Sequence, residues 1–362
     1  MTTDPPLPDP TLDYNALAQH IRRWGMELGF QQVGIAGTQL DEDEAYLMKW
    51  LEAGHHGEMD YMERHGTHRS RPAELVPGTL RVISVRMDYW PNQAQAPDDV
   101  LQDASLAYLS RYALGRDYHK LIRKRLQQLA TKIEALTGPF GYRAFTDSAP
   151  VLEKALAQQA GLGWIGKHTN LINERHGSWF FIGELYTNLP LPPDAPAENH
   201  CGSCRSCIDV CPTRAIIAPY TLDARLCISY LTIELRDAIP EALRPLIGNR
   251  IYGCDDCQLV CPWNRFAGPT GEDDFQPRHG LDSSELVRLF GWSIDEFASN
   301  TRGSAIHRIG YDCWLRNIAV GLGNAPTSAE VITALRAREA HDSALVREHV
   351  VWALRQHGVN SG

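Results

Sequence analysis

Eight of the nine cysteines fall between positions 201 and 261, and their spacing predicts iron–sulfur chemistry. The first four read C-x2-C-x2-C-x3-C before Pro212, and the last three read C-x2-C-x3-C before Pro262. In chain order the eight are Cys201, Cys204, Cys207, Cys211, Cys227, Cys254, Cys257 and Cys261. Because four thiolates hold one cubane cluster, the eight cysteines predict two 4Fe–4S clusters and the transfer of single electrons.

The division of these cysteines between two clusters follows from the spacing. The first run matches bacterial ferredoxins, in which three cysteines hold one cluster and the fourth reaches the other. The second run lacks its leading cysteine, and the isolated Cys227 replaces it. We assign to one cluster Cys201, Cys204, Cys207 and Cys261. We assign to the other Cys211, Cys227, Cys254 and Cys257.

Two other uses of cysteine fit this spacing less well. Zinc sites use C-x2-C pairs, but they need neither the third cysteine nor the following proline. Disulfides need an oxidising compartment, and residues 1–6 have neither the positive nor the apolar region of a signal peptide. Cys313, the ninth cysteine, lies in an apolar stretch and is expected to be a buried structural thiol.

Length and composition predict a cytoplasmic protein of two or three domains. The chain has 362 residues, of which 43% are hydrophobic and 22% charged. No apolar run is long enough to cross a bilayer, so no membrane association is expected. The net charge of −9 argues against indiscriminate binding of nucleic acid.

Two local concentrations of basic residues nevertheless suggest a nucleic-acid groove. The first comprises Arg111, Arg116, His119, Lys120, Arg123, Lys124 and Arg125. The second comprises Arg64, His65, His68, Arg69 and Arg71. A solvated helix face or loop explains either concentration equally well.

Hydrophobic periodicity predicts an α+β chain of several domains. Helices are expected at residues 15–30, 43–52, 118–136 and from 147–150 to about 160. Strands are expected at residues 80–89, 142–146 and 179–187. This alternation favours an α/β domain at 15–190 after a flexible tail at 1–14. A ferredoxin-like domain at 191–282 and a helical region at 283–362 follow, and the latter resembles a HEAT-type repeat or a plain two-helix cap.

The first domain must use the electrons, and two of its segments are candidates for doing so. Asp147 follows a predicted strand and is a candidate catalytic acid, although it could equally cap the next helix. As an acid it would need a pKa raised by burial or by an electron-rich neighbour. The glycines of Gly161-Leu162-Gly163-Trp164-Ile165-Gly166-Lys167 could admit a flat cofactor, or the segment could be a simple helix-to-strand loop.

Several long segments together resemble the epoxyqueuosine reductase family over almost the whole chain. The first two are Ser110-Arg111-Tyr112-Ala113-Leu114-Gly115-Arg116-Asp117-Tyr118-His119-Lys120 and Asp147-Ser148-Ala149-Pro150-Val151-Leu152-Glu153. The others are residues 161–167, Cys227-Ile228-Ser229-Tyr230-Leu231-Thr232-Ile233-Glu234 and the stretch from Cys254 to Trp263. Long matches in the same order are more specific than any single motif.

The resemblance implies an enzyme that removes the epoxide oxygen of epoxyqueuosine in tRNA as water. It implies cobalamin in the N-terminal domain, beside the two clusters, and it places the proton donor at Asp147. Corrin contacts would fall near Ser110, Leu171, Ile182 and Ser229, together with Asp147. A D-x-H-x-x-G motif is absent, so no protein histidine is expected on cobalt. Electrons would come from an external donor, and a monomer is expected because one chain supplies all eight thiols.

Three alternatives remain open at this point. A cobalamin-dependent reductive dehalogenase would pair the same cofactors, but members of that class usually carry an export signal and lack a helical tail. A pure electron-transfer protein would leave the first 190 residues unexplained. A tRNA-binding scaffold would use the clusters only as structural staples.

Overall fold

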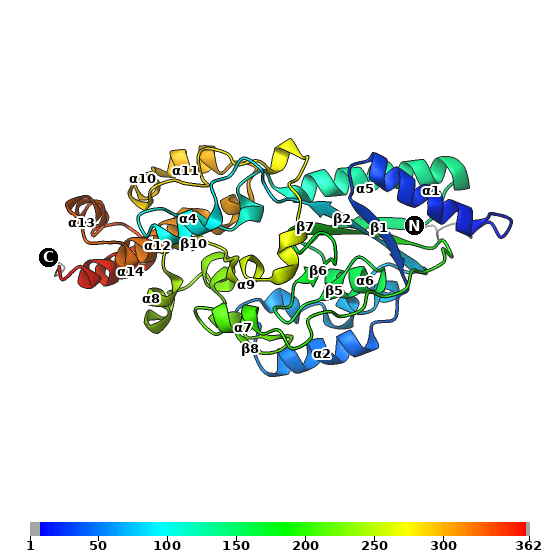
Figure 1. Cartoon of the computed structure of the whole chain (residues 1–362), viewed down its shortest axis with the longest axis horizontal. Coiled ribbons are helices and arrows are strands. Elements are labelled where there is room, and N and C mark those ends of the chain that lie inside the picture. Colours follow the sequence, from blue (N-terminus) through cyan, green and yellow to red (C-terminus); the bar gives the residue numbers. More distant parts are fainter. Residues whose placement is uncertain (1–7, 360–362) are drawn as a thin grey trace.

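An antiparallel sheet with helices on both faces forms the N-terminal part of the chain. The computed structural model describes residues 8–359, and Figure 1 shows this sheet at one end of an elongated molecule. The helices here are α1 (Tyr14–Glu27), α2 (Asp41–Glu52), α3 (Pro72–Leu75), α4 (Pro97–Gln102), α5 (Tyr118–Thr137) and α6 (Glu153–Gln159). The strands are β1 (Gln32–Ala36), β2 (Arg81–Asp88), β3 (Tyr108–Leu109), β4 (Tyr142–Phe145), β5 (Trp164–Ile165), β6 (Leu171–Ile172) and β7 (Phe180–Thr187).

The sheet has the order β1-β2-β7-β4, and every neighbouring pair is antiparallel. The predicted helices and strands are therefore present, but their alternation does not produce a parallel sheet. Helices α1 and α5 cover one face, where Leu17 and Ile122 pack against Ile83. Helix α6 covers the other face, where Leu156 packs with Val82. The sheet thus separates two apolar cores, and residues of both cores line the site described below.

The expected helix after Asp147 begins later than the sequence predicts. Helix α6 starts at Glu153, and its N-cap position is Leu152, which makes no side-chain capping bond. Asp147 lies before the helix with φ of 53°, in the left-handed region that few residues other than glycine adopt. The alternative in which Asp147 caps the helix is therefore wrong, and its carboxylate is available for other contacts.

The cysteine-rich segment is short and irregular. It contains α7 (Ser206–Val210), β8 (Ile216–Ala218), β9 (Thr221–Leu222), α8 (Arg244–Ile247), β10 (Arg250–Tyr252) and α9 (Asp256–Leu259). Strand β10 pairs in parallel with β3, which belongs to the N-terminal part of the chain. This pairing ties residues 108–109 to the cysteine-rich segment, so the predicted domain range 15–190 includes a stretch that packs outside the sheet.

The C-terminal region is helical, as the sequence predicts. It contains α10 (Leu286–Phe290), α11 (Ile294–Asn300), α12 (Gly310–Asn324), α13 (Ala329–Arg336) and α14 (Ala344–Gln356). Helices α12 and α14 pack together around Trp314, Val350 and Trp352, at the far end of the molecule from the sheet (Figure 1). Cys313 is buried in α12, as expected. The finer resemblance to a HEAT repeat stays a prediction.

The predicted flexible tail at 1–14 lies partly outside the residues that the structure describes. Residues 1–7 of the predicted tail lie outside them, whereas Asp13 caps α1 by accepting bonds from the backbone N–H groups of Asn15 and Ala16. None of the helices between residues 8 and 359 is long and apolar enough to cross a membrane.

Candidate functional site

The structure places four of the cysteines around one pocket, and these four are the set assigned above to the first cluster. Cys201, Cys204, Cys207 and Cys261 line one small pocket. Burial, followed by the charges of the other three thiols, raises the pKa of Cys207 to about 11. The thiols surround a space and do not meet at a point, and within residues 8–359 no group of three ligands is set to hold a single metal ion. A cubane, which is held by thiolates around an inorganic core, fits such an arrangement.

The second group lies deeper in the chain. Burial, and then the charges of Cys227 and its neighbours Asp255, Cys207 and Cys211, raise the pKa of Cys257 well above its usual value. The charge of Cys257 acts in turn on Cys254. Cys227 therefore lies near Cys211 and Cys257, and its place in the second cluster stays a prediction.

The glycine-rich segment supports the first cysteine group. Lys167 donates from Nζ to the carbonyl oxygens of Gly202 and Cys204, at 2.6 and 2.8 Å, and Trp164 donates from Nε1 to Cys201 Sγ at 3.5 Å. A Cβ atom added at Gly163 would lie 2.2 Å from the backbone oxygen of Ile172. Protein backbone thus occupies the space beside Gly163, which favours the helix-to-strand loop over a seat for a flat cofactor.

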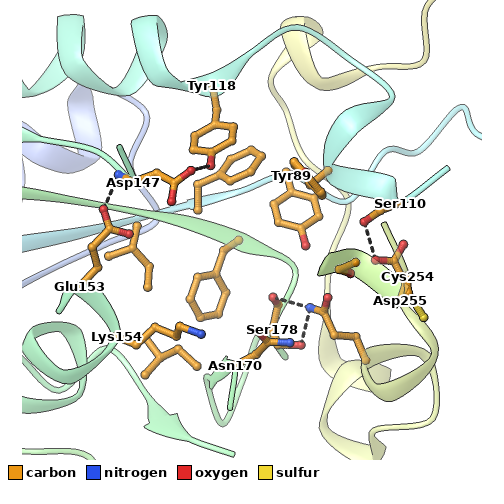
Figure 2. Close-up of a pocket in the computed structure, with 17 residues that line it drawn as sticks. Tyr89, Ser110, Tyr118, Asp147, Glu153, Lys154, Asn170, Ser178, Cys254 and Asp255 are labelled. Atoms are coloured by element: carbon orange, nitrogen blue, oxygen red, sulfur yellow. Dashed lines mark hydrogen bonds between the residues drawn. The ribbon is translucent and has the colours of Figure 1, made fainter. Parts of the chain in front are cut away.

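A larger cavity, of about 300 Å³, lies between the sheet domain and the second cysteine group. All five residues predicted to contact the cofactor line it, namely Ser110, Asp147, Leu171, Ile182 and Ser229. Cys254 also lines this cavity and belongs to the second cysteine group. Figure 2 shows Asp147 and Cys254 on opposite sides of the cavity. The sheet domain and the cluster segment therefore meet at one site.

Asp255 fixes the wall between the cavity and the second cysteine group. Its buried carboxylate accepts bonds from Ser110 Oγ at 2.6 Å, Tyr108 OH at 2.8 Å and the Arg111 backbone N–H at 2.8 Å. These bonds join the segment around Ser110 to the loop that carries Cys254. They explain why residues so far apart in sequence line one cavity.

Asp147 makes close contacts with the first turn of α5. Tyr118 donates from its hydroxyl to Asp147 Oδ2 at 2.5 Å, and His119 Nε2 lies 3.3 Å from the same oxygen. Asp117, the N-cap of α5, lies 2.6 Å from His119 Nδ1 through its Oδ1 atom. The backbone N–H of Asp147 donates to Glu153 Oε1, and this contact appears in Figure 2 with the Tyr118 bond. Asp147 lines the cavity, so surrounding protein partly shields its carboxylate from water although 54% of the side chain is exposed.

The protonation of this group differs from the expectation that Asp147 has a raised pKa. Burial raises it, but hydrogen bonds from His119 and Tyr118 outweigh burial, and the pKa of Asp147 is lowered. Burial lowers the pKa of His119, but hydrogen bonds to Asp117 and Asp147 outweigh it and raise that pKa to about 9. At neutral pH the imidazole carries the proton and the Asp147 carboxylate is ionised.

Sequence reasoning missed several residues of the cavity. Tyr118 and His119 belong to a segment singled out above, but only the fold places them against Asp147, which is almost thirty positions away. Glu153 and Lys154 also line the cavity and were not predicted. The signal that could have identified them is the first turn of α6, which directly follows the Asp147 loop.

The predicted basic concentrations divide into buried and exposed members. Arg111 and Arg69 are buried, and Arg71 pairs with Glu44 at 2.8 Å. Lys120, Arg123 and Lys124 are exposed on α5, beginning one residue after His119. The exposed basic face of α5 therefore begins at the edge of the cavity.

Comparison with known proteins relates this arrangement to characterised chains. Residues 200–264 match a model for a 4Fe-4S double cluster binding domain. Residues 69–148 match a model described as epoxyqueuosine reductase QueG. An epoxyqueuosine reductase of Pseudomonas aeruginosa is 65% identical over 352 residues, which are 97% of this chain and 96% of that protein. One from Escherichia coli K12 is 58% identical over 95% of this chain and 90% of its own length.

Solved structures of epoxyqueuosine reductases are similar to this chain over almost its whole length. An epoxyqueuosine reductase with an epoxyqueuosine-modified tRNA-Tyr stem loop has a TM-score of 0.87 at 26% identity, covering 96% of this chain and 91% of its own. One from Bacillus subtilis, described with its catalytic loop swung out of the active site, has a TM-score of 0.83 at 25% identity, covering 95% and 91%.

Proposed function

The chain belongs to the epoxyqueuosine reductase family, and from that premise we propose which of its residues reduce epoxyqueuosine in tRNA to queuosine. Membership selects the reductase among the alternatives that the sequence left open. The observation that carries the assignment of roles is the shared cavity, because Cys254 of the second cysteine group and Asp147 both line it. We assign the eight cysteines to the two clusters in the groups described above.

The cavity suits cobalamin, a large flat macrocycle ringed by amide side chains. Its lining mixes apolar residues such as Leu171 and Ile182 with polar ones such as Ser110 and Ser229. In the sheet, Arg86 of β2 pairs with Ile182 of β7, and Ser84 of β2 pairs with the buried Glu184 of β7. Buried side-chain nitrogens and oxygens of these three polar residues have no hydrogen-bond partner within residues 8–359. These three residues do not line the cavity but lie behind its lining residues Phe180 and Ile182. The fit rests on the lining itself, whose mixture of apolar and polar side chains suits the apolar faces and the amide edge of such a macrocycle.

Each residue of the cavity then has a distinct task. When bound, cobalamin supplies a strongly reducing cobalt centre that can deliver electrons to a strained epoxide. Ser110, Leu171, Ile182 and Ser229 hold the macrocycle, and Asp147 faces the open side of the cavity, where it protonates the departing oxygen. Tyr118 and the N-terminal turn of α5 orient the carboxylate. Asp255 keeps the Cys254 loop against the cavity wall.

The tRNA would approach over the exposed basic face of α5. An anticodon loop presents unpaired bases that can be splayed into a pocket, so an opening lined by Asp147 suits it. Lys120, Arg123 and Lys124 would contact phosphates beside that opening. In the second basic concentration, Arg64 and His68 are exposed and are further candidates for contacting the tRNA. The C-terminal helical region is another candidate. We place this reaction in the cytoplasm, with a monomeric enzyme and an external electron donor.

Removing the positive charges near the opening should weaken tRNA binding. In a Lys120→Ala/Lys124→Ala variant the affinity for an epoxyqueuosine stem loop should fall at low salt, and the slope of log K against log salt should decrease by about 1 per lost phosphate contact. Lys132→Ala is the matched control, because Lys132 lies about 18 Å further along α5 and pairs with Glu27 at 3.1 Å. A binding titration at several salt concentrations measures both. A parent affinity that does not vary with salt would rule out phosphate contacts.

A further inference from the structure

Reduction of an epoxide to an alkene consumes two electrons and two protons. Both C–O bonds of the ring break, a C=C bond forms, and the oxygen leaves as water. One carboxyl carries at most one proton, and the pKa of Asp147 is lowered by its bonds to His119 and Tyr118 despite burial. Because one carboxyl supplies one proton, the reaction needs a second donor beside Asp147, and a group that returns the proton to Asp147.

His119 is placed to store the first proton. Its Nε2 atom lies 3.3 Å from Asp147 Oδ2, and its Nδ1 atom lies 2.6 Å from Asp117 Oδ1. Its ring stacks on Tyr118 at a centroid distance of 4.4 Å, and Tyr118 stacks on Phe181 at 3.8 Å. Two carboxylates and a rigid aromatic stack thus hold the imidazolium in line with Asp147.

Glu153 is placed to store the second proton. Its side chain lines the same cavity, and its Oε1 atom accepts the backbone N–H of Asp147. Burial, and then the negative charge of Asp147, raise the pKa of Glu153 to about 8. At neutral pH most Glu153 carboxyls therefore hold a proton, and Glu153 contacts the backbone of Asp147 whereas His119 contacts its carboxylate.

We propose that His119 and Glu153 are the two proton stores of the reaction, His119 reloading Asp147 through Oδ2 and Glu153 supplying the second proton within the same cavity. This proposal rests on the assigned role of Asp147 at the epoxide oxygen. His119 acts through Asp147 and is a positioning and proton-storing residue. After turnover both protons return from water through the open side of the cavity.

The other charged groups around the two stores are consistent with these roles. His119 faces Asp117, Tyr118 and Asp147, and Arg308 adds a positive charge that acts on Asp147. The charge of Asp147 raises the pKa of Glu153, whereas the charges of His119 and of Lys154, on its own helix, lower it. Its charge acts in turn on Arg69, which precedes α3, and on Glu184 of β7. Glu184 is fully buried, with a pKa raised well above the usual range, so it adds no negative charge at neutral pH.

Single-turnover reduction by the cobalamin-loaded holoenzyme tests the proposal. The rate is measured at saturating epoxyqueuosine stem loop from about pH 6 to about pH 10, for the parent and for Glu153→Gln and His119→Gln. Glutamine at position 153 keeps an oxygen for the Asp147 N–H but holds no acidic proton. His20→Gln is the control, because His20 lies on α1 and does not line the cavity. Cluster absorbance and stem-loop affinity verify that each variant is intact.

The parent rate should fall as the pH rises through about 8, where Glu153 loses its proton, and further through about 9, where His119 does. Each variant should lower kcat by roughly 100-fold and leave KM for the stem loop unchanged. Glu153→Gln should remove the fall in rate near pH 8, and His119→Gln the fall near pH 9. NMR titration of the His119 ring in the holoprotein should show a midpoint near 9 that drops in Asp147→Asn.

Two results would overturn the proposal and leave the reductase function standing. One is a parent rate that is flat to about pH 10, and the other is a pair of variants that keep the parent rate and profile. A parent holoenzyme that produces no queuosine at any pH would instead overturn the function on which the proposal rests.

Discussion

Replacing Asp147 with asparagine is expected to lower kcat by about 10²- to 10⁴-fold, the usual contribution of a positioned acid. Asparagine fills the same space and can still accept the hydroxyl bond of Tyr118, so the cavity should keep its shape. It cannot deliver a proton to the departing oxygen. Because the change acts on the chemical step, kcat and kcat/KM should fall together.

The measurement is anaerobic turnover of epoxyqueuosine-containing tRNA, with cluster and cobalamin content matched between proteins. Ser148→Ala is the control, because Ser148 lies in the same loop and its hydroxyl donates a long 3.5 Å bond to the Thr146 carbonyl. A kcat for Asp147→Asn within a few-fold of the parent would show that another group protonates the oxygen.

Replacing Cys227 with alanine is expected to remove one cluster and abolish turnover. Cys227 is the ligand assigned because the second run lacks its leading cysteine, so it is the sharpest test of the grouping. A cluster that loses one of four thiolates is not retained, and the iron content should fall from about eight to about four per chain. Electrons would then have no path past the second group to the cavity.

Cys313→Ala is the matched control for this experiment. Cys313 is the ninth cysteine, it is buried in α12, and it belongs to neither predicted group. It should keep the full iron content and the parent activity, with only a loss of stability. The grouping is wrong if Cys227→Ala keeps about eight irons while Cys313→Ala loses them.

Strong local patterns made much of the fold predictable. Helix α5 was expected at 118–136 and spans Tyr118–Thr137, because its apolar residues recur at helical spacing and Gly138 ends it. Strand β1 was missed, because five residues that include Gly34 give a weak signal. The antiparallel order could not be read from the sequence, since β2 pairs with β7 almost one hundred residues away.

The site divides in the same way. The two cysteine groups are predicted from spacing alone, because ligand geometry restricts the intervals between thiols, and the structure places the four cysteines of the first group around one pocket. The state of Asp147 does not follow, because it depends on Tyr118 and His119 approaching from another element. The α6 start signals at residues 147–150 were misleading, since Asp147 takes a left-handed conformation in which it caps nothing. Tertiary contacts here override the local preference.

We propose that one chain joins two clusters to a cobalamin cavity in which the epoxide is reduced. The most direct test is metal analysis of anaerobically prepared protein, reconstituted with cobalamin, together with conversion of epoxyqueuosine-containing tRNA by the same sample. We predict about eight irons and about one cobalt per chain, and queuosine formation only when both metals are present. Zinc in the cysteine sites, or full conversion by protein without cobalt, would contradict the account.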